Sequence, residues 1–113
     1  MAKVTITESH NFDKKDVFNI IGAVTMDKVK GTRIEAIGAA LGTDISHETG
    51  EVVPTGYIKA TDGKIYSTIS PTAHQSIEAL IDLLADEGGK PIAINVETRR
   101  SNSGRDFIIL KLE

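Results

Sequence analysis

The chain has 113 residues, of which 40% are hydrophobic and 26% charged, which is typical of a single globular domain. It contains no cysteine, which excludes a disulfide framework, a thiolate metal site and a cysteine nucleophile. The formal net charge of −3 is unevenly distributed, because residues 72–89 hold four of the 16 acidic side chains and none of the 13 basic ones. No apolar run is long enough to span a bilayer, and the opening MAKVTITESH lacks the apolar core of a signal peptide, so we expect an intracellular protein.

The start of the chain, residues 1–30, is expected to be a short N-terminal extension. Its pattern indicates a strand at residues 3–7 and a helical turn at residues 16–21. Phe12 and Phe18 are assigned to anchoring this extension.

The first strands of the main domain are predicted between residues 32 and 70. Residues 32–41 read as a long strand that its glycines allow to bend. Residues 51–60 and 64–70 flank Asp62-Gly63, which is typical of a hairpin with a two-residue turn. The side chains expected on the core face of this hairpin are Ile58, Ala60, Ile65 and Ile69.

The clearest element is a helix at residues 71–87. Ser70 is its expected N-cap and Pro71 its first residue, while Gly88-Gly89 ends it. Its apolar side chains follow helical spacing along one face: Ala73, Ile77, Leu80, Ile81 and Leu84. Two alternating runs follow as strands, at residues 91–98 and 105–112.

From residue 32 the predicted order is strand, strand, strand, helix, strand, strand. This is the element order of the OB-fold, a five-stranded, partly open barrel with one α-helix between strands three and four. We therefore expect a mainly β protein with an OB-fold domain at residues 31–113 behind the extension at residues 1–30. Other small β-rich folds share this order and stay open as alternatives.

No arrangement of residues indicates catalysis. The three histidines lie far apart, and none has a partner at metal-ligand spacing. Asp44, His47 and Glu48 share one loop, which fits a solvated surface better than a cation site. The glycines of residues 38–42 lack the spacing of a phosphate loop. We therefore expect a protein that is not an enzyme and that uses no metal and no cofactor.

Basic side chains surround the last hairpin tip, where RRSNSGR places Arg99, Arg100 and Arg105. In an OB-fold this loop joins strands four and five and is one of two that grip a bound nucleic acid. Guanidinium groups suit phosphate oxygens and also stack on bases. A solubilising hairpin tip would have the same composition, so both interpretations stay open. The opposite loop, residues 43–51, is net acidic, which argues against a symmetrical clamp.

One strand face is expected to carry Tyr57, Lys59, Lys64 and Tyr66, because side chains alternate along the two strands of the first hairpin. Bases stack on aromatic rings while ammonium groups follow the backbone, so this face suits a single strand of nucleic acid. The alternative for Tyr57 is packing beneath the N-terminal extension. Phe107 also alternates outward and joins the candidate set, although a lone Phe on such a strand more often packs.

The run TDGKIYSTISPTAHQSIEALIDLL at residues 61–84 resembles the single-stranded DNA-binding proteins of small tailed phages that replicate by protein priming. GTRIEAIGA at residues 31–39 and the final FIILKL are similar to other strands of that family. The resemblance implies an OB-fold that coats single strands exposed during strand-displacement replication, without sequence preference. It also implies that Tyr66 is a DNA-contacting tyrosine. Gly42 stands near a position where family members can carry another tyrosine.

The expected function is therefore sequence-independent binding and protection of displaced single strands during phage DNA replication. The expected partners are single-stranded DNA and replication proteins of the same replicon, with no membrane, and the protein would be a monomer or small homo-oligomer in the host cytoplasm. The alternative is an OB-fold protein–protein interaction module, either a phage inhibitor of a host protein or an assembly subunit. The negative charge and the acidic helix favour that alternative.

Overall fold

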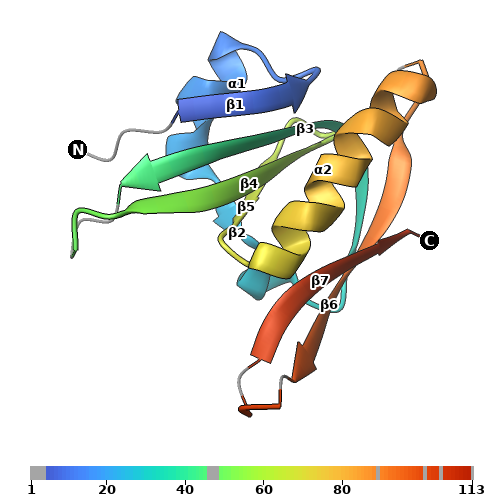
Figure 1. Ribbon diagram of the computed structural model, residues 1–113. Helices are drawn as coiled ribbons and strands as arrows, with labels where there is room; N and C mark the ends of the chain where they lie inside the picture. The colour runs from blue at the N-terminus through green and yellow to red at the C-terminus, as the bar shows by residue number, and fades with distance from the viewer. Residues whose placement is uncertain (1–4, 46–48, 89, 101, 105, 113) are drawn as a thin grey trace.

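The computed structural model describes residues 5–45, 49–88, 90–100, 102–104 and 106–112 (Figure 1). The helices and strands that it contains, together with the 3-10 turns η1 and η2, follow one another in chain order. They are β1 (Thr5–His10), α1 (Lys14–Asn19), η1 (Ile20–Gly22), β2 (Val24–Thr25), η2 (Met26–Val29), β3 (Arg33–Ile45), β4 (Val52–Ala60), β5 (Ile65–Thr68), α2 (Pro71–Asp86), β6 (Ile92–Arg100) and β7 (Asp106–Leu112).

The strands form one sheet in the order β2-β5-β4-β3-β6-β7, with β1 paired to β3. The 13-residue β3 bends at an irregularity between Ala36 and Gly38, so its first part pairs with β6 and its second part with β4. The sheet thereby curls into a half-barrel, and α2 covers its concave side (Figure 1). The main hydrophobic core lies between α2 and the sheet, where Ile58, Ile77 and Leu84 are fully buried.

The half-barrel is open on the side where the edge strand β2 and the end of β5 face β7, because no ladder joins β7 to either strand in the described part of the chain. Within the described residues, the side chain of Ser70 bridges the opening. Ser70 Oγ donates a hydrogen bond to the carbonyl oxygen of Ile108 at 2.9 Å and accepts one from the backbone N–H of Ala73 at 3.3 Å. Ser70 is thus the N-cap of α2 and also ties that helix to β7.

The mainly β class is confirmed, but the predicted count of five strands is wrong, because the structure has seven. The helix follows the fifth strand of the chain rather than the third. Both differences come from the N-terminal residues, which supply β1 and β2 to the sheet. The predicted helix is confirmed, with its Ser70 cap, Pro71 start and all five apolar positions buried.

The turn between β4 and β5 contains one residue more than predicted. The N–H of Ala60 donates to the carbonyl of Lys64, which leaves Thr61, Asp62 and Gly63 in the turn, with Gly63 at φ +86°. Shifting the register by one residue moves every side chain of the second strand to the opposite face. Ile58 therefore pairs with Tyr66, and both lie on the core side of the sheet.

A second, smaller core lies on the other face of the sheet. It consists of Ala40, Tyr57 and Ile65, covered by Ile6, Phe12, Ile20 and Ala23 of the N-terminal segment. The role of Phe12 as an anchor is confirmed by this packing. The same prediction for Phe18 is wrong, because its side chain on α1 is 74% exposed. The prediction that Ile69 faces the core is also wrong, since the chain leaves β5 before it and its side chain is exposed.

Two glycines of β3 lie where the N-terminal segment approaches closely. A Cβ at Gly38 would lie 2.5 Å from the carbonyl oxygen of Asn11, and one at Gly42 would collide with the carbonyl oxygen of Thr5. These positions have no space for a side chain while β1 is in place. No helix among the described residues combines the length and apolar character that crossing a membrane requires.

Candidate nucleic-acid interface

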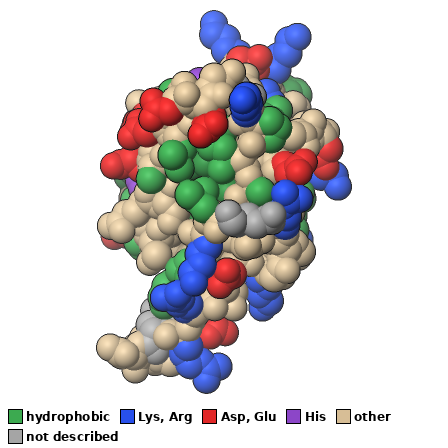
Figure 2. Space-filling view, turned by 90° about the vertical axis from the view of Figure 1, so that its right-hand side faces the viewer, with side chains coloured by type: hydrophobic (Ala, Val, Ile, Leu, Met, Phe, Trp, Pro, Cys, Tyr) green, Lys and Arg blue, Asp and Glu red, His purple; other side chains and the backbone are tan. Residues whose placement is uncertain are grey.

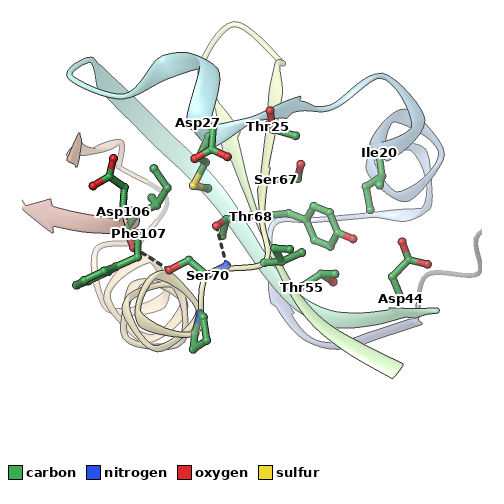
Figure 3. A pocket seen from close by; sticks show the side chains of 15 residues that line it. Ile20, Thr25, Asp27, Asp44, Thr55, Ser67, Thr68, Ser70, Asp106 and Phe107 are labelled. Carbon is green, nitrogen blue, oxygen red and sulfur yellow. Dashed lines mark hydrogen bonds between the residues drawn. The ribbon is translucent and has the colours of Figure 1, made fainter. Parts of the chain in front are cut away.

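A cavity of about 710 Å³ lies along the opening of the half-barrel (Figure 3). Ser67 and Thr68 of β5 line it on one side, and Asp106 and Phe107 of β7 line it on the other. At the far end it reaches Asp44, near the end of β3. The cavity therefore runs from the β3–β4 end of the sheet to the β6–β7 hairpin.

Side chains from three adjacent strands form the floor of this cavity. Thr55 and Tyr57 alternate onto the same face of β4, and β-pairing sets Tyr57 opposite Ser67 of β5. Thr55 pairs with Gly42, so Asp44, two residues further along β3, shares that face. The four polar side chains Asp44, Thr55, Tyr57 and Ser67 thus form a row across the sheet, which we call the polar row.

Tyr57 is buried in the polar row rather than exposed as predicted, with 3% of its surface accessible. Phe12 stacks on its ring, with centroids 6.1 Å apart and an interplanar angle of 28°. The alternative, packing beneath the N-terminal segment, is the arrangement found. Burial raises the pKa of Tyr57; the neighbouring Thr55 hydroxyl opposes this shift and the Asp44 carboxylate adds to it. The phenol is therefore protonated at neutral pH.

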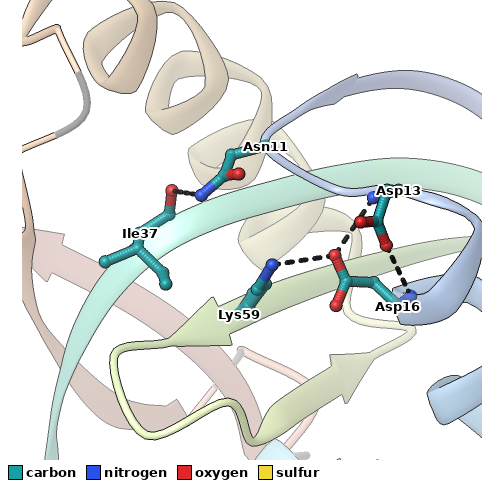
Figure 4. Close-up of polar contacts among 5 residues, drawn as sticks. All are labelled: Asn11, Asp13, Asp16, Ile37 and Lys59. Atoms are coloured by element: carbon teal, nitrogen blue, oxygen red, sulfur yellow. Dashed lines mark hydrogen bonds and ion pairs between the residues drawn. The ribbon is translucent and has the colours of Figure 1, made fainter.

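Lys59 is likewise not exposed on an open face, as had been predicted. Its Nζ lies 2.9 Å from Oδ2 of Asp16 on α1, and the two side chains are 18% and 9% exposed (Figure 4). Asp16 also accepts from the N–H of Asp13, whose own carboxylate accepts from the N–H of Asp16. This reciprocal capping box begins α1 and lowers the pKa of Asp13 through the hydrogen bond from the Asp16 backbone. Lys59 therefore fastens α1 to the sheet.

Tyr66 and Lys64 do not share a face with Tyr57, because the longer turn reverses the orientation of β5. Tyr66 is half-buried against the main core, and Lys64 is exposed beside the turn. The structure therefore does not bring the four predicted side chains onto one surface. Contact of these residues with DNA stays a prediction.

The β6–β7 hairpin places basic side chains at one end of the cavity. Arg99 pairs with Phe107 across the two strands, and Arg99 and Arg100 are exposed. Arg100 Nε lies 3.4 Å from Oδ1 of Asp106, with side chains 74% and 64% exposed, so this ion pair is weak and easily exchanged. Phe107 is half-buried and lines the cavity. Arg105 lies outside the described residues.

The cavity lining itself carries no Lys or Arg among the described residues, but three carboxylates, those of Asp27, Asp44 and Asp106. Phosphate groups are therefore disfavoured inside it, and the guanidinium groups lie outside it on the hairpin. Of the loop considered for a cation, His47 and Glu48 lie outside the described residues. Within the described residues, no group of three or more acidic or histidine side chains is arranged to hold a metal ion.

Sequence reasoning did not find Thr55, Ser67 or Asp27 as cavity residues. Strand alternation places Thr55 on the same face as Tyr57, so this signal was present in the sequence. The opening between β5 and β7 carries no local signal, because it depends on two strands about 40 positions apart failing to pair.

A curled, mainly β half-barrel with a basic hairpin beside a cavity is a scaffold on which nucleic-acid-binding proteins are built. The sequence model of a family described as phage single-stranded DNA-binding protein matches residues 7–113, nearly the whole chain. The chain therefore belongs to the family of phage single-stranded DNA-binding proteins. This match confirms the resemblance seen at residues 61–84, and it supports single-stranded DNA as the partner. Comparison with curated proteins and with solved structures gave no match.

Proposed function

We propose that this protein binds single-stranded DNA without sequence requirement and coats strands displaced during phage DNA replication, without catalysing a reaction. One observation carries this proposal beyond the family: at the hairpin where the cavity ends, Phe107 lines the cavity, and the exposed Arg99 lies directly opposite Phe107 on the same face of the two strands, with the exposed Arg100 next to it. Guanidinium groups attract phosphates, and a neighbouring aromatic ring offers a surface for a base. The strand would follow the opening of the half-barrel, with its backbone on the hairpin side.

The same proposal includes the OB-fold as the fold type, with residues 1–30 as an extension and residues 31–113 as the binding domain. Arg99, Arg100 and Phe107 are the proposed primary contacts, with Arg105 as a further phosphate contact in the same hairpin. Lys64 is a proposed peripheral phosphate contact because it is exposed. Tyr66, Tyr57 and Lys59 remain in the proposed set of DNA contacts. Tyr57 and Lys59 are buried under the N-terminal segment, so they would contact DNA only from within the cavity or after that segment moves. The place of action would be the host cytoplasm, together with other replication proteins.

The test is fluorescence anisotropy of a labelled oligo-dT strand titrated with the protein at two salt concentrations, with duplex DNA as competitor. Affinity should fall steeply with salt, because each phosphate contact releases counterions. Replacing Arg99 and Arg100 by Ala should weaken binding and lower the slope of log K against log salt by about one unit for each lost contact. Lys90→Ala, which removes an exposed charge beyond the far end of α2, is the matched control. Absence of binding by the folded protein at low salt would overturn the proposal.

A second candidate function, a protein-interaction module, is favoured by a different surface. A groove of about 170 Å³ lies between α2 and the last two strands, lined by apolar side chains that include Leu83, Leu110 and Leu112. Figure 2 shows hydrophobic side chains gathered in the middle of this face, with acidic side chains to their left. Binding to a protein through such a groove would depend little on salt, which separates it from DNA binding.

A further inference from the structure

The polar row at the floor of the cavity contains a buried hydroxyl group without a hydrogen-bond partner. Thr55 Oγ1 is inaccessible, in a residue that is 5% exposed. It lies near enough to the Tyr57 hydroxyl to oppose the rise of that group's pKa, but it completes no hydrogen bond of ordinary geometry with a described residue. Buried polar groups are nearly always paired, and an unpaired one costs free energy. Such a group lining a cavity indicates a site for a ligand that supplies the missing partner.

The chemistry around Thr55 restricts what that ligand can be. A carboxylate only accepts hydrogen bonds, and Asp44 and Asp27 both line the cavity without a basic neighbour in the described lining. Asp106, the third carboxylate, is paired with Arg100. The site therefore favours a group that donates hydrogen bonds, such as the amino group of a base, and disfavours a phosphate. Its volume of about 710 Å³ lies within the range of small-molecule sites and admits a nucleotide base with its sugar.

We propose that the polar row reads the edge of one base of the bound strand and prefers bases that carry an exocyclic amino group. The inference rests on the proposed single-strand binding and adds a preference to it. The amino group would donate to Asp44, and the hydroxyl group of Tyr57 would donate to the adjacent ring nitrogen or carbonyl oxygen. The hydroxyl group of Thr55, which is shielded in the unbound site, would join them once the base displaces the side chains that cover it. Thymine and uracil present a carbonyl oxygen in place of the amino group, which a carboxylate repels.

Tyr57 contributes to this site through its hydroxyl group and not through stacking. Phe12 stacks on its ring, so the edge that lines the cavity is what remains for a ligand. A phenol whose pKa is raised from its ordinary value of about 10 is fully protonated at pH 7.5, as an unshifted phenol also would be, and is able to donate. Phe107, which lines the cavity on the β7 side, supplies the apolar contact for the base.

The decisive comparison is between oligo-dC and oligo-dU of the same length at pH 7.5, because cytosine and uracil differ only at the edge in question. Anisotropy titrations should give a dissociation constant for dC at least about fivefold lower than for dU, the lower end of what base-edge hydrogen bonds contribute to discrimination. Oligo-dT measured alongside reports the base-independent part of binding.

Three variants locate the preference. Asp44→Asn keeps the size and the acceptor oxygen but adds an amide donor, so the ratio of the dU to the dC constant should fall to about one. Thr55→Val should lower the same ratio while the protein stays folded, because it removes an unpaired hydroxyl and retains the shape. Asp86→Asn, on the exposed face of α2, removes one negative charge elsewhere and should leave the ratio unchanged.

The outcomes separate the two proposals. Equal affinity for dC and dU in the unaltered protein, or an unchanged ratio in Asp44→Asn, would overturn the base preference while single-strand binding stands. Failure to bind dC, dU and dT at low salt would overturn the proposed function itself.

Discussion

Ser70 joins the first turn of α2 to the backbone of Ile108 on β7, and these two residues form a hydrogen-bonded link across the open side of the half-barrel. One hydroxyl serves both ends of the link, because it accepts from the helix and donates to the strand. This side chain holds the start of α2 at a fixed distance from β7, and both residues line the cavity, so the cavity's shape depends on it.

Ser70→Ala should therefore lower the free energy of unfolding by more than the loss of an ordinary N-cap does. Loss of an N-cap costs about 1 kcal/mol, and leaving the Ile108 carbonyl unpaired adds about 1 kcal/mol or more. Urea denaturation measures the change. Ser76→Ala is the matched control, since Ser76 lies within the same helix and bonds only to the carbonyl of Thr72. Equal stability of the two variants would contradict the link.

Lys59→Met should destabilise the protein because it leaves the Asp16 carboxylate largely buried without its cation. We expect a loss of about 2–4 kcal/mol, near the range for broken buried pairs. A double-mutant cycle with Asp16→Ala measures the coupling between the two side chains. The exposed pair of Arg100 and Asp106 provides the contrast, because Arg100→Ala should cost under about 1 kcal/mol. A coupling as small as that of the exposed pair would refute the fastening role of Lys59.

Replacing Phe12 by Ala should lower the stability of the fold much more than replacing Phe18 by Ala. Phe12→Ala removes the ring stacked on Tyr57 and should cost about 2–3 kcal/mol, toward the low end for large aromatic truncations because Phe12 is only half-buried. Phe18→Ala removes an exposed ring and should change stability by less than about 0.5 kcal/mol. Thermal or urea unfolding of the two variants checks this. A large loss from Phe18→Ala would mean that its ring packs in solution.

Tyr57 should make the protein less stable in strongly alkaline solution. Its pKa is raised in the folded state, so above the ordinary value of about 10 the unfolded chain loses this proton while the folded chain retains it. Folding stability then falls as the pH rises, because the unfolded state binds fewer protons. Stability measured from pH 8 to 11 should decline less steeply in Tyr57→Phe. Parallel declines would show that other groups account for the alkaline loss.

The helix and the strands from β3 onward could be predicted because their signals are local. Ser70, Pro71 and the spacing of five apolar side chains define α2 without reference to the rest of the chain. The orientation of Tyr66 could not be predicted, because one extra residue in the turn at Asp62-Gly63 reverses a whole strand. The pairing of β1 with β3 joins residues 29 to 38 positions apart, and no local pattern reports such a contact. The prediction of an exposed face is wrong for this reason, because the N-terminal segment covers Tyr57 and Lys59.

Gly42 lies so close to strand β1 that any larger side chain at this position would clash with the backbone of Thr5. At this position of β3 a side chain and the present path of β1 therefore exclude each other. Replacing Gly42 by tyrosine would drive its Cβ against the carbonyl oxygen of Thr5, so a ring could stand here only if β1 first moved away from β3.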